Sequence, residues 1–249
     1  MIEINKLYNS FKIFILTYND EKMIAKLLND LVNVEDVLIV DSFSDDETVE
    51  ICKKFGREVV QNKFINQAIQ CNWAIDKFFD SGDWILRLDS DERIDELLLT
   101  ELEALTARNI PIVGYLHREM YWMGKKLKYS ALRKHYIGRF FLKGHAVYEE
   151  ITEEHLIHTC PSINLKTKFY EQNNKNLIDY FIEKHVQTAK GEVNELFQPD
   201  KVNKGSLLAK NTHMKTRWLK ISFYNKAPIF SRAICYFIYR YFIKCGFLD

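Results

Sequence analysis

The stretch Lys12–Asp41, KIFILTYNDEKMIAKLLNDLVNVEDVLIVD, changes its hydrophobic period twice. Lys12–Thr17 is a short apolar run of strand length, and Val37–Val40 is a second such run that ends in Asp41. Between the two runs, apolar residues recur at helical spacing, after acidic residues in the first turn. These apolar residues are Met23, Ile24, Leu27, Leu28 and Leu31. The stretch therefore predicts a strand, a helix and a second strand, the unit from which parallel sheets are built.

The same alternation continues for the next sixty residues or so. Ser44 or Asp45 is expected to cap the helix that follows Asp41, and Gly56 to end it. The further expected elements are a strand at Val59–Val60, a helix at Asn66–Phe79, a strand at Trp84–Leu88 and a helix at Asp95–Ala107. This order predicts an α/β fold, with a mostly parallel, Rossmann-like sheet and helices on both of its faces.

Polar groups follow three of the expected strands. They are Tyr18-Asn19, Asp41 and Asp89-Ser90-Asp91. Because the carboxyl ends of parallel strands meet at one edge of a sheet, and ligands bind outside that edge, we expect these groups to converge on one site.

Composition narrows the class of protein. The chain has 249 residues, with Lys+Arg 35 against Asp+Glu 34 and a formal net charge of +1, so no global field draws it to nucleic acid. Hydrophobic content of 47% and charged content of 28% are those of a packed globular protein. The five cysteines show neither C-x-x-C spacing nor a pairing scheme, and residues 1–10 lack the apolar core of a secretory signal, so we expect a cytoplasmic protein.

The composition changes after Pro111, and we divide the chain into three parts. The first part is residues 1–112 and the second is residues 113–195, with strands expected at Val113–Trp122 and Arg139–Leu142 and a helix at Asn176–Gln187. Residues 196–249 form a basic and aromatic helical extension.

The end of this extension, Arg217–Asp249, mixes many aromatic residues with Arg and Lys, and Asp249 is its one acidic side chain. Arg232, Arg240 and Lys244 interrupt the apolar run too often for a membrane span. The composition is typical of an amphipathic helix lying in a membrane interface, although a C-terminal helix packed on its own domain would also carry basic residues that reach into water. We therefore expect a peripheral protein on the inner face of the cell membrane.

The strongest signal for chemistry is Trp84–Glu92, WILRLDSDE. Asp89 and Asp91, two carboxylates separated by one residue at the exit of a buried strand, form a hard oxygen site suited to Mg²⁺ or Mn²⁺. The alternative is an acidic turn before the helix that starts at Asp95. The chain has no G-x-x-x-x-G-K-[ST] and no G-x-G-x-x-G, so a bound diphosphate would rely on a metal.

These motifs resemble those of family 2 glycosyltransferases of the GT-A fold, and in particular the bacterial group that includes lipopolysaccharide core β-1,4-glucosyltransferases. The resemblance rests on Ile15–Glu21 (ILTYNDE), Val37–Thr48 (VLIVDSFSDDET), Gly82–Arg93 (GDWILRLDSDER), Arg139-Phe140-Phe141, Glu153–Leu156 (EEHL) and Gly246–Asp249 (GFLD). It implies an inverting, metal-dependent transfer of a hexose from a nucleotide sugar, with residues 1–112 binding this donor and residues 113–195 binding the acceptor.

On the donor side, the resemblance implies that Tyr18 and Asp41 contact the base, which we expect to be uracil. Asp89 and Asp91 form the D-x-D motif, with Asp91 the direct metal ligand. Asn72, in Gln70-Cys71-Asn72, stands where the family has Q-R-N and is assigned to the donor.

On the acceptor side, the resemblance implies that Glu154 is the general base and that His155 orients it or contacts the acceptor. Arg139 is expected to meet diphosphate or acceptor charge. Glu171 stands where the family has a histidine near the metal and, as a carboxylate, can itself ligate Mg²⁺ or Mn²⁺.

The sequence thus predicts an enzyme that builds bacterial cell-envelope glycans such as lipopolysaccharide or O-antigen. Its partners would be a UDP-sugar, a glycolipid or oligosaccharide acceptor and the membrane surface. Cys71 in place of the family's arginine leaves open a degenerate member that binds nucleotide or membrane without transferring sugar. A sugar-1-phosphate nucleotidyltransferase is a further alternative, but it would need a glycine-rich loop where the chain has Tyr18–Glu21.

Overall fold

The structure is a computed structural model. It describes residues 7–122, 125–129, 135–150 and 155–172, and in the C-terminal part residues 182, 185–186, 188–191, 193, 218–219, 222 and 226–249. The chain forms two compact units, one of Met1–Lys125 with Lys134–Glu183 and the other of Lys126–Arg133 with Lys184–Asp249. The proposed division at residue 112 stays a prediction.

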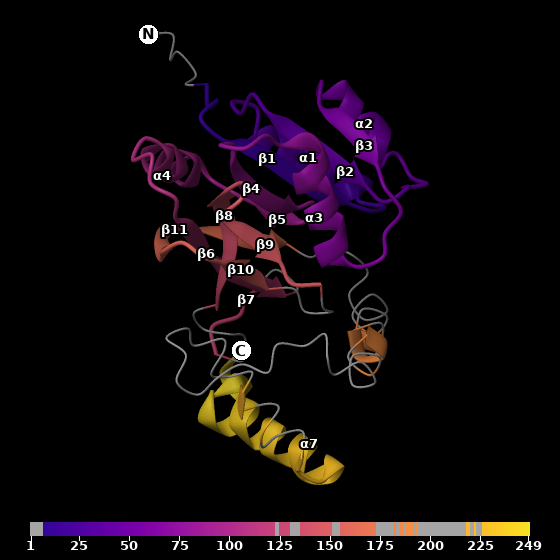
Figure 1. Cartoon of the computed structure of the whole chain (residues 1–249). Coiled ribbons are helices and arrows are strands. Elements are labelled where there is room, and N and C mark those ends of the chain that lie inside the picture. The colour runs from indigo at the N-terminus through magenta and orange to yellow at the C-terminus, as the bar shows by residue number, and fades with distance from the viewer. Residues whose placement is uncertain are drawn as a thin grey trace. The chain divides into compact units, whose positions relative to one another are not determined.

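The first part of the chain alternates strands and helices as predicted (Figure 1). The elements are β1 (Lys12–Thr17), α1 (Glu21–Asp30), β2 (Val37–Asp41), α2 (Thr48–Lys54), β3 (Glu58–Gln61), α3 (Gln67–Phe78), β4 (Trp84–Asp89), β5 (Glu92–Arg93) and α4 (Glu96–Thr106). Two of the predicted helices start with a side-chain cap, since Asn66 accepts from Ile69 N at 2.8 Å and Asp95 accepts from Leu98 N at 3.0 Å.

One expected cap is wrong. The hydroxyl of Ser44 donates to Asp41 and accepts from Asn19 N instead of capping α2. The helix begins later, at Thr48, and its N-cap residue Glu47 makes no side-chain capping bond. The loop before α2 is therefore held by β2 and the β1–α1 loop.

The second part of the chain extends the same sheet. Its elements are β6 (Val113–Trp122), β7 (Lys125–Lys126), β8 (His135–Leu142), β9 (Ala146–Tyr148), β10 (Leu156–His158) and β11 (Ser162–Gln172). Within the described residues, nine strands form one sheet in the order β3-β2-β1-β4-β8-β6-β11-β5, with β7 paired to β6. The pairs among β3, β2, β1 and β4 are parallel, whereas β8 is antiparallel to both of its neighbours.

Helices cover both faces of the parallel region, as predicted. The apolar residues of α1 and α4 pack with Ile13 and Ile15 of β1 on one face. The apolar residues of α3 pack with Phe14 on the other. Because strand residues alternate between faces, the apolar run of β1 supplies both cores.

The second unit ends in α7 (Ile229–Ile238), which continues as a π-helical turn (Tyr239–Ile243) and a 3₁₀ turn (Gly246–Leu248). Among the described residues, no helix is both long and apolar enough to cross a membrane. The helix expected at Asn176–Gln187 lies largely outside the described residues.

Candidate active site

The polar strand ends meet at one edge of the sheet, which confirms that prediction. Ser42 N donates to Thr17 O at 3.0 Å, so the loop after β2 lies against the end of β1. On the other side of β1, Ser90 N donates to Leu16 O at 3.3 Å. Asn62, directly after β3, donates its backbone N–H to Asp41 O at 3.0 Å. The four parallel strands thus present one continuous edge to a ligand.

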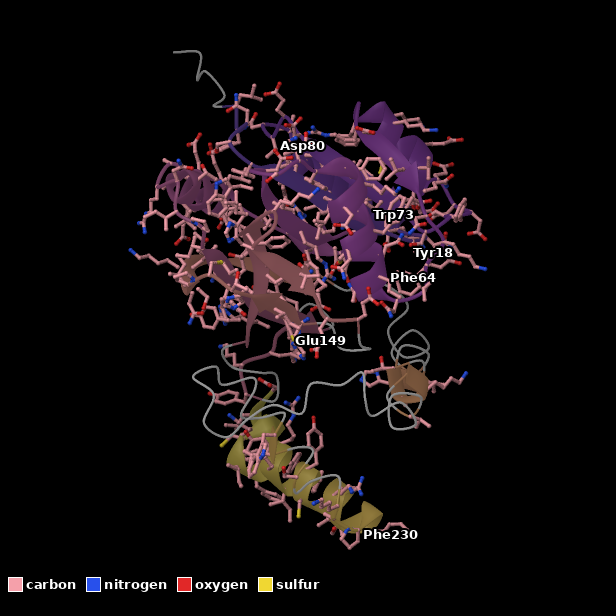
Figure 2. The ribbon with its side chains drawn as sticks, in the orientation of Figure 1. Tyr18, Phe64, Trp73, Asp80, Glu149 and Phe230 are labelled. Carbon is pink, nitrogen blue, oxygen red and sulfur yellow. The ribbon has the colours of Figure 1, made fainter. Side chains whose placement is uncertain are left out.

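Two loops of this edge are bound to each other. Asn19 N donates to Ser44 Oγ at 2.9 Å, and Asp45 N donates to Asn19 Oδ1 at 3.0 Å. Tyr18, labelled in Figure 2, stays 55% exposed. Its position leaves the ring accessible for the predicted contact with a base, a role that stays a prediction.

Asp41 lies below these loops and is completely buried. Its carboxylate accepts four hydrogen bonds, from Thr17 Oγ1 (3.0 Å), Ser44 N (2.9 Å), Ser44 Oγ (2.5 Å) and Gln61 Nε2 (2.9 Å). The arrangement makes Asp41 the anchor of the loop after β2. The predicted hydrogen bond from a base to Asp41 would require one of these donors to give way.

The first carboxylate of the D-x-D motif is held by arginines. Asp89 is 24% exposed, and it lies 3.1 Å from Arg87 Nη2 and 2.9 Å from Arg139 Nη2. Gln67, in the first turn of α3, also donates to Asp89 Oδ1 at 3.3 Å. Burial by itself raises the pKa of Asp89, but the guanidinium groups of Arg139 and Arg87 outweigh it and hold that pKa well below its usual range.

Arg139 links this carboxylate to a second one. Its Nη2 lies 2.9 Å from Glu92 Oε1 as well as from Asp89, and Glu92 Oε2 accepts from Asp89 N at 2.9 Å. Complete burial raises the pKa of Glu92 to about 8, with the charges of Asp89 and Asp91 adding to the rise and Arg139 opposing it. Arg139 is itself 4% exposed, so it braces the D-x-D loop from below instead of presenting a free cation at the surface.

The metal-ligand predictions stay predictions. Asp91 follows the end of β4, and Glu171 of β11 pairs in register with Glu92, next to the D-x-D motif. Arg118 Nη1 lies 3.2 Å from Glu171 Oε2, so this carboxylate already has a cationic partner. Within the described residues, no group of three or more His, Cys, Asp and Glu side chains is placed to hold a metal.

The side chain of Asn72 is bound to the backbone of β9. Its Nδ2 donates to Tyr148 O at 2.9 Å and its Oδ1 accepts from Tyr148 N at 3.0 Å, so the amide ties α3 to β9. Gln70 of the same helix faces the edge instead, and it donates to Ser42 Oγ at 3.4 Å and accepts from Asn62 Nδ2 at 2.8 Å. A donor contact by Asn72 would need this clamp to open.

The predicted general base, Glu154, lies outside the described residues. Its neighbour His155 is half-buried, and its backbone carbonyl accepts from Glu149 N at 2.9 Å, beside the antiparallel pair of β9 and β10. The catalytic roles of Glu154 and His155 therefore stay predictions.

Sequence reasoning missed several residues that shape this site. Arg87, Glu92 and Gln67 all contact Asp89. One signal for Arg87 was available, because a charged residue inside the apolar run WILRL needs a buried partner. Gln67 and Gln70 stand at adjacent positions of one helix face, but no local pattern indicates that this face meets the strand ends.

Comparison with known proteins relates the chain to glycosyltransferases. Residues 12–166 match the protein family described as "Glycosyl transferase family 2". An uncharacterised glycosyltransferase of Rickettsia typhi is 35% identical over 95 residues, which is 38% of this chain and 32% of that protein. The lipopolysaccharide core biosynthesis glycosyltransferase LpsC of Rhizobium meliloti is 29% identical over 117 residues, which is 45% of this chain and 43% of LpsC. The match therefore spans about a third of the length of the Rickettsia relative.

Among solved structures, Staphylococcus aureus TarS 1–349 in complex with UDP has a similar fold. The TM-score is 0.50 at 16% identity, and the similarity covers 89% of this chain and 76% of TarS 1–349. The GT-A type of α/β fold expected from the sequence is thus confirmed. Because the family match covers more than half of the chain, from β1 into β11, and includes the whole strand-end edge, the chain belongs to glycosyl transferase family 2.

Proposed function

We propose that the chain transfers a hexose from a UDP-sugar to a hydroxyl group of a glycolipid or oligosaccharide acceptor, with inversion at the anomeric carbon. The observation that carries the proposal is the D-x-D motif at the strand-end edge, with Asp89 fixed by Arg87 and Arg139. Family membership and the LpsC relative support it, as does the UDP bound by TarS, a protein of similar fold.

The donor would lie along the ends of β2, β1 and β4, with its base beside Tyr18 and its diphosphate toward Asp91. Two arginines already neutralise Asp89, so we assign Asp91 to the cation. One or two carboxylates completed by substrate phosphates are the donor set that Mg²⁺ and Mn²⁺ take in such sites, so these residues fit the ion. When bound, the ion would stabilise the charge that develops on the leaving diphosphate.

Glu154 would remove the proton from the acceptor hydroxyl, and His155 would hold the acceptor or Glu154 in place. The acceptor oxygen then attacks the anomeric carbon on the face opposite the diphosphate, and the bond to the nucleotide breaks. General-base assistance of this kind contributes about 10²–10⁴-fold. Positioning and charge stabilisation at the strand-end edge must supply the rest.

Nucleotide release from a panel of UDP-sugars tests this proposal. The assay is run with and without Mn²⁺ in the presence of a crude glycolipid extract. We expect metal-dependent release of UDP from one donor, which also identifies the sugar. UDP binding without release from any donor would favour a nucleotide-binding protein that has lost transfer, and no binding of any uridine nucleotide would remove the base site at Tyr18.

The exposed side chains of the C-terminal helix favour the proposal that the acceptor is bound to a membrane. From α7 to the end of the chain, large apolar side chains are exposed, including Phe230 at 84% and Ile243 at 68% (Figure 2). The basic residues of this segment are Arg232, Arg240 and Lys244. Its one acid, Asp249, accepts backbone hydrogen bonds from Lys128 and Tyr129. Aromatic and basic residues together suit a bilayer surface that contains anionic lipid.

Replacing Arg232, Arg240 and Lys244 together by glutamine is expected to weaken binding to anionic vesicles about 100-fold, since each basic residue near such a surface contributes about 1 kcal/mol. Co-sedimentation with vesicles of phosphatidylglycerol and phosphatidylethanolamine measures the change. The control replaces the exposed Lys26, Lys53 and Lys54 of α1 and α2, which removes the same charge. Equal losses in both triple variants would show that net charge, and not this helix, determines binding.

A further inference from the structure

Phe43 has a backbone conformation that its side chain disfavours. Its φ is +62°, in the left-handed region that glycine and asparagine enter most readily. Among the described residues, the others that are not glycine and have a positive φ are Asn19, Asn109 and Cys245. A bulky residue in this region persists only where its surroundings hold it there, and such positions cluster at functional sites.

The surroundings that hold Phe43 come from Asp41. The carboxylate of Asp41 accepts from Ser44 N at 2.9 Å and from Ser44 Oγ at 2.5 Å, which closes the turn around Phe43. On the other side of the turn, Ser42 N donates to Thr17 O at 3.0 Å. The turn is thus fixed from both ends while the side chain of Phe43 remains 57% exposed. Burial of the ring therefore accounts poorly for a phenylalanine at this position.

The hydrogen bonds that join the two loops place Phe43 opposite Tyr18. One bond joins Ser42 to Thr17, and the next joins Ser44 Oγ to Asn19 N at 2.9 Å. Phe43 lies between Ser42 and Ser44 in the loop after β2. Tyr18 lies between Thr17 and Asn19 in the loop after β1. Both rings are more than half exposed, and neither is in contact with another aromatic ring of the described residues.

We propose that Phe43 and Tyr18 together seat the nucleobase of the donor, with Phe43 as a base-contacting residue that the strained turn presents to the ligand. The inference rests on the proposed function, because it takes a nucleotide as the ligand of this edge. The planar face of a base stacks well on aromatic side chains, and the position outside adjoining ends of parallel strands is where such ligands bind.

If Phe43 has this role, replacing it by glycine should raise the stability of the fold and weaken the binding of UDP. In Phe43→Gly, glycine adopts the positive φ without strain, so the melting temperature is expected to rise by about 2 °C. The same change removes one stacking surface, so affinity for UDP is expected to fall about tenfold. Phe43→Leu keeps the backbone strain but lacks the ring, so it should weaken UDP binding with no gain in melting temperature.

Asn109→Gly provides the matched control. Asn109 also has a positive φ, of 51°, but it follows the C-terminal end of α4 and lies outside the strand-end loops. Relief of strain there should leave UDP binding unchanged. Thermal unfolding and calorimetric titration with UDP, both in the presence of Mn²⁺, measure both quantities for each full-length variant.

The outcomes separate this inference from the proposed function. UDP binding to Phe43→Gly at wild-type affinity would overturn the role of Phe43 while leaving the proposed function intact. A fall in melting temperature together with weaker binding would assign Phe43 a structural role and equally overturn it. Failure of the wild-type protein to bind UDP, GDP, CDP or dTDP would overturn the proposed function and the inference with it.

Discussion

The Asp91→Asn protein is expected to transfer sugar about a thousandfold more slowly than the wild type, while folding with near-normal stability. Loss of the anionic oxygen weakens the hold on a divalent cation, whose charge stabilisation is worth several kcal/mol in a transition state. A loss of about 4 kcal/mol corresponds to about three orders of magnitude in rate. The measurement is kcat/KM for UDP release at several Mn²⁺ concentrations, with a chelator arm that removes the ion from the wild type.

Asp83→Asn is the matched control for this prediction. Asp83 precedes β4 and Asp91 follows it, so the two carboxylates lie at opposite ends of one strand. Asp83 Oδ2 pairs with Lys12 Nζ at 2.9 Å, and we expect its loss to leave transfer within about twofold of wild type, as for exposed ion pairs. If Asp91→Asn depended on Mn²⁺ in the same way as the wild type, Asp91 would not be the metal ligand. Glu171 would then be the next residue to replace.

Local patterns were sufficient for the first half of the fold. Apolar runs predicted β1 and β4, and apolar residues at helical spacing predicted α1. Hydrophobic periods act over a few residues, so a single sequence contains them. The convergence of the strand ends followed from topology, because parallel strands joined by helices must end at one edge.

The second half depends on contacts that no local pattern contains. β11 (Ser162–Gln172) was not predicted, because it mixes polar and apolar residues and pairs in parallel with β6 across a register shift between Asn164 and Lys168. Likewise, the partner of Asn72 is Tyr148, 76 residues away in the chain. Arg139 was expected to contact substrate, but it pairs with carboxylates 50 and 47 residues away. Family resemblance assigned both residues to the ligand, and those roles stay predictions, while their protein partners could not be read from the sequence.

The buried arginine gives the largest expected effect on stability. Arg139→Met is expected to lower the free energy of unfolding by about 3–5 kcal/mol, the cost of breaking a buried ion pair by removing one partner. Asp89 and Glu92 each lose an N–H donor at 2.9 Å, while the apolar stem of methionine can still pack on Phe169. Urea unfolding measures the change, and the expected fall in melting temperature is roughly 10 °C.

Lys12→Met is the control for this substitution. Lys12 and Asp83 also form an ion pair at 2.9 Å, but their side chains are 33% and 19% exposed, and an exposed pair is worth about 1 kcal/mol or less. A similar small loss in Arg139→Met would contradict the assignment of Arg139 as a buried brace. Asp89 would then be held by Arg87 and Gln67.

The free energy of unfolding that Arg139→Met loses should also depend on pH, in the direction that the pKa of Asp89 determines. The arginines hold the pKa of Asp89 well below its usual range, so near pH 3 the folded chain binds fewer protons than the unfolded chain. The attraction therefore stabilises the fold fully above the unfolded pKa of about 3.9 and is lost as the pH falls below it. Unfolding curves of the two proteins should lie furthest apart near neutral pH and approach each other below about pH 4. If the two unfolding curves stayed equally far apart at all pH values, Arg139 would stabilise the fold through packing. If they approach each other at low pH, Arg139 stabilises the fold through its attraction to the charged Asp89.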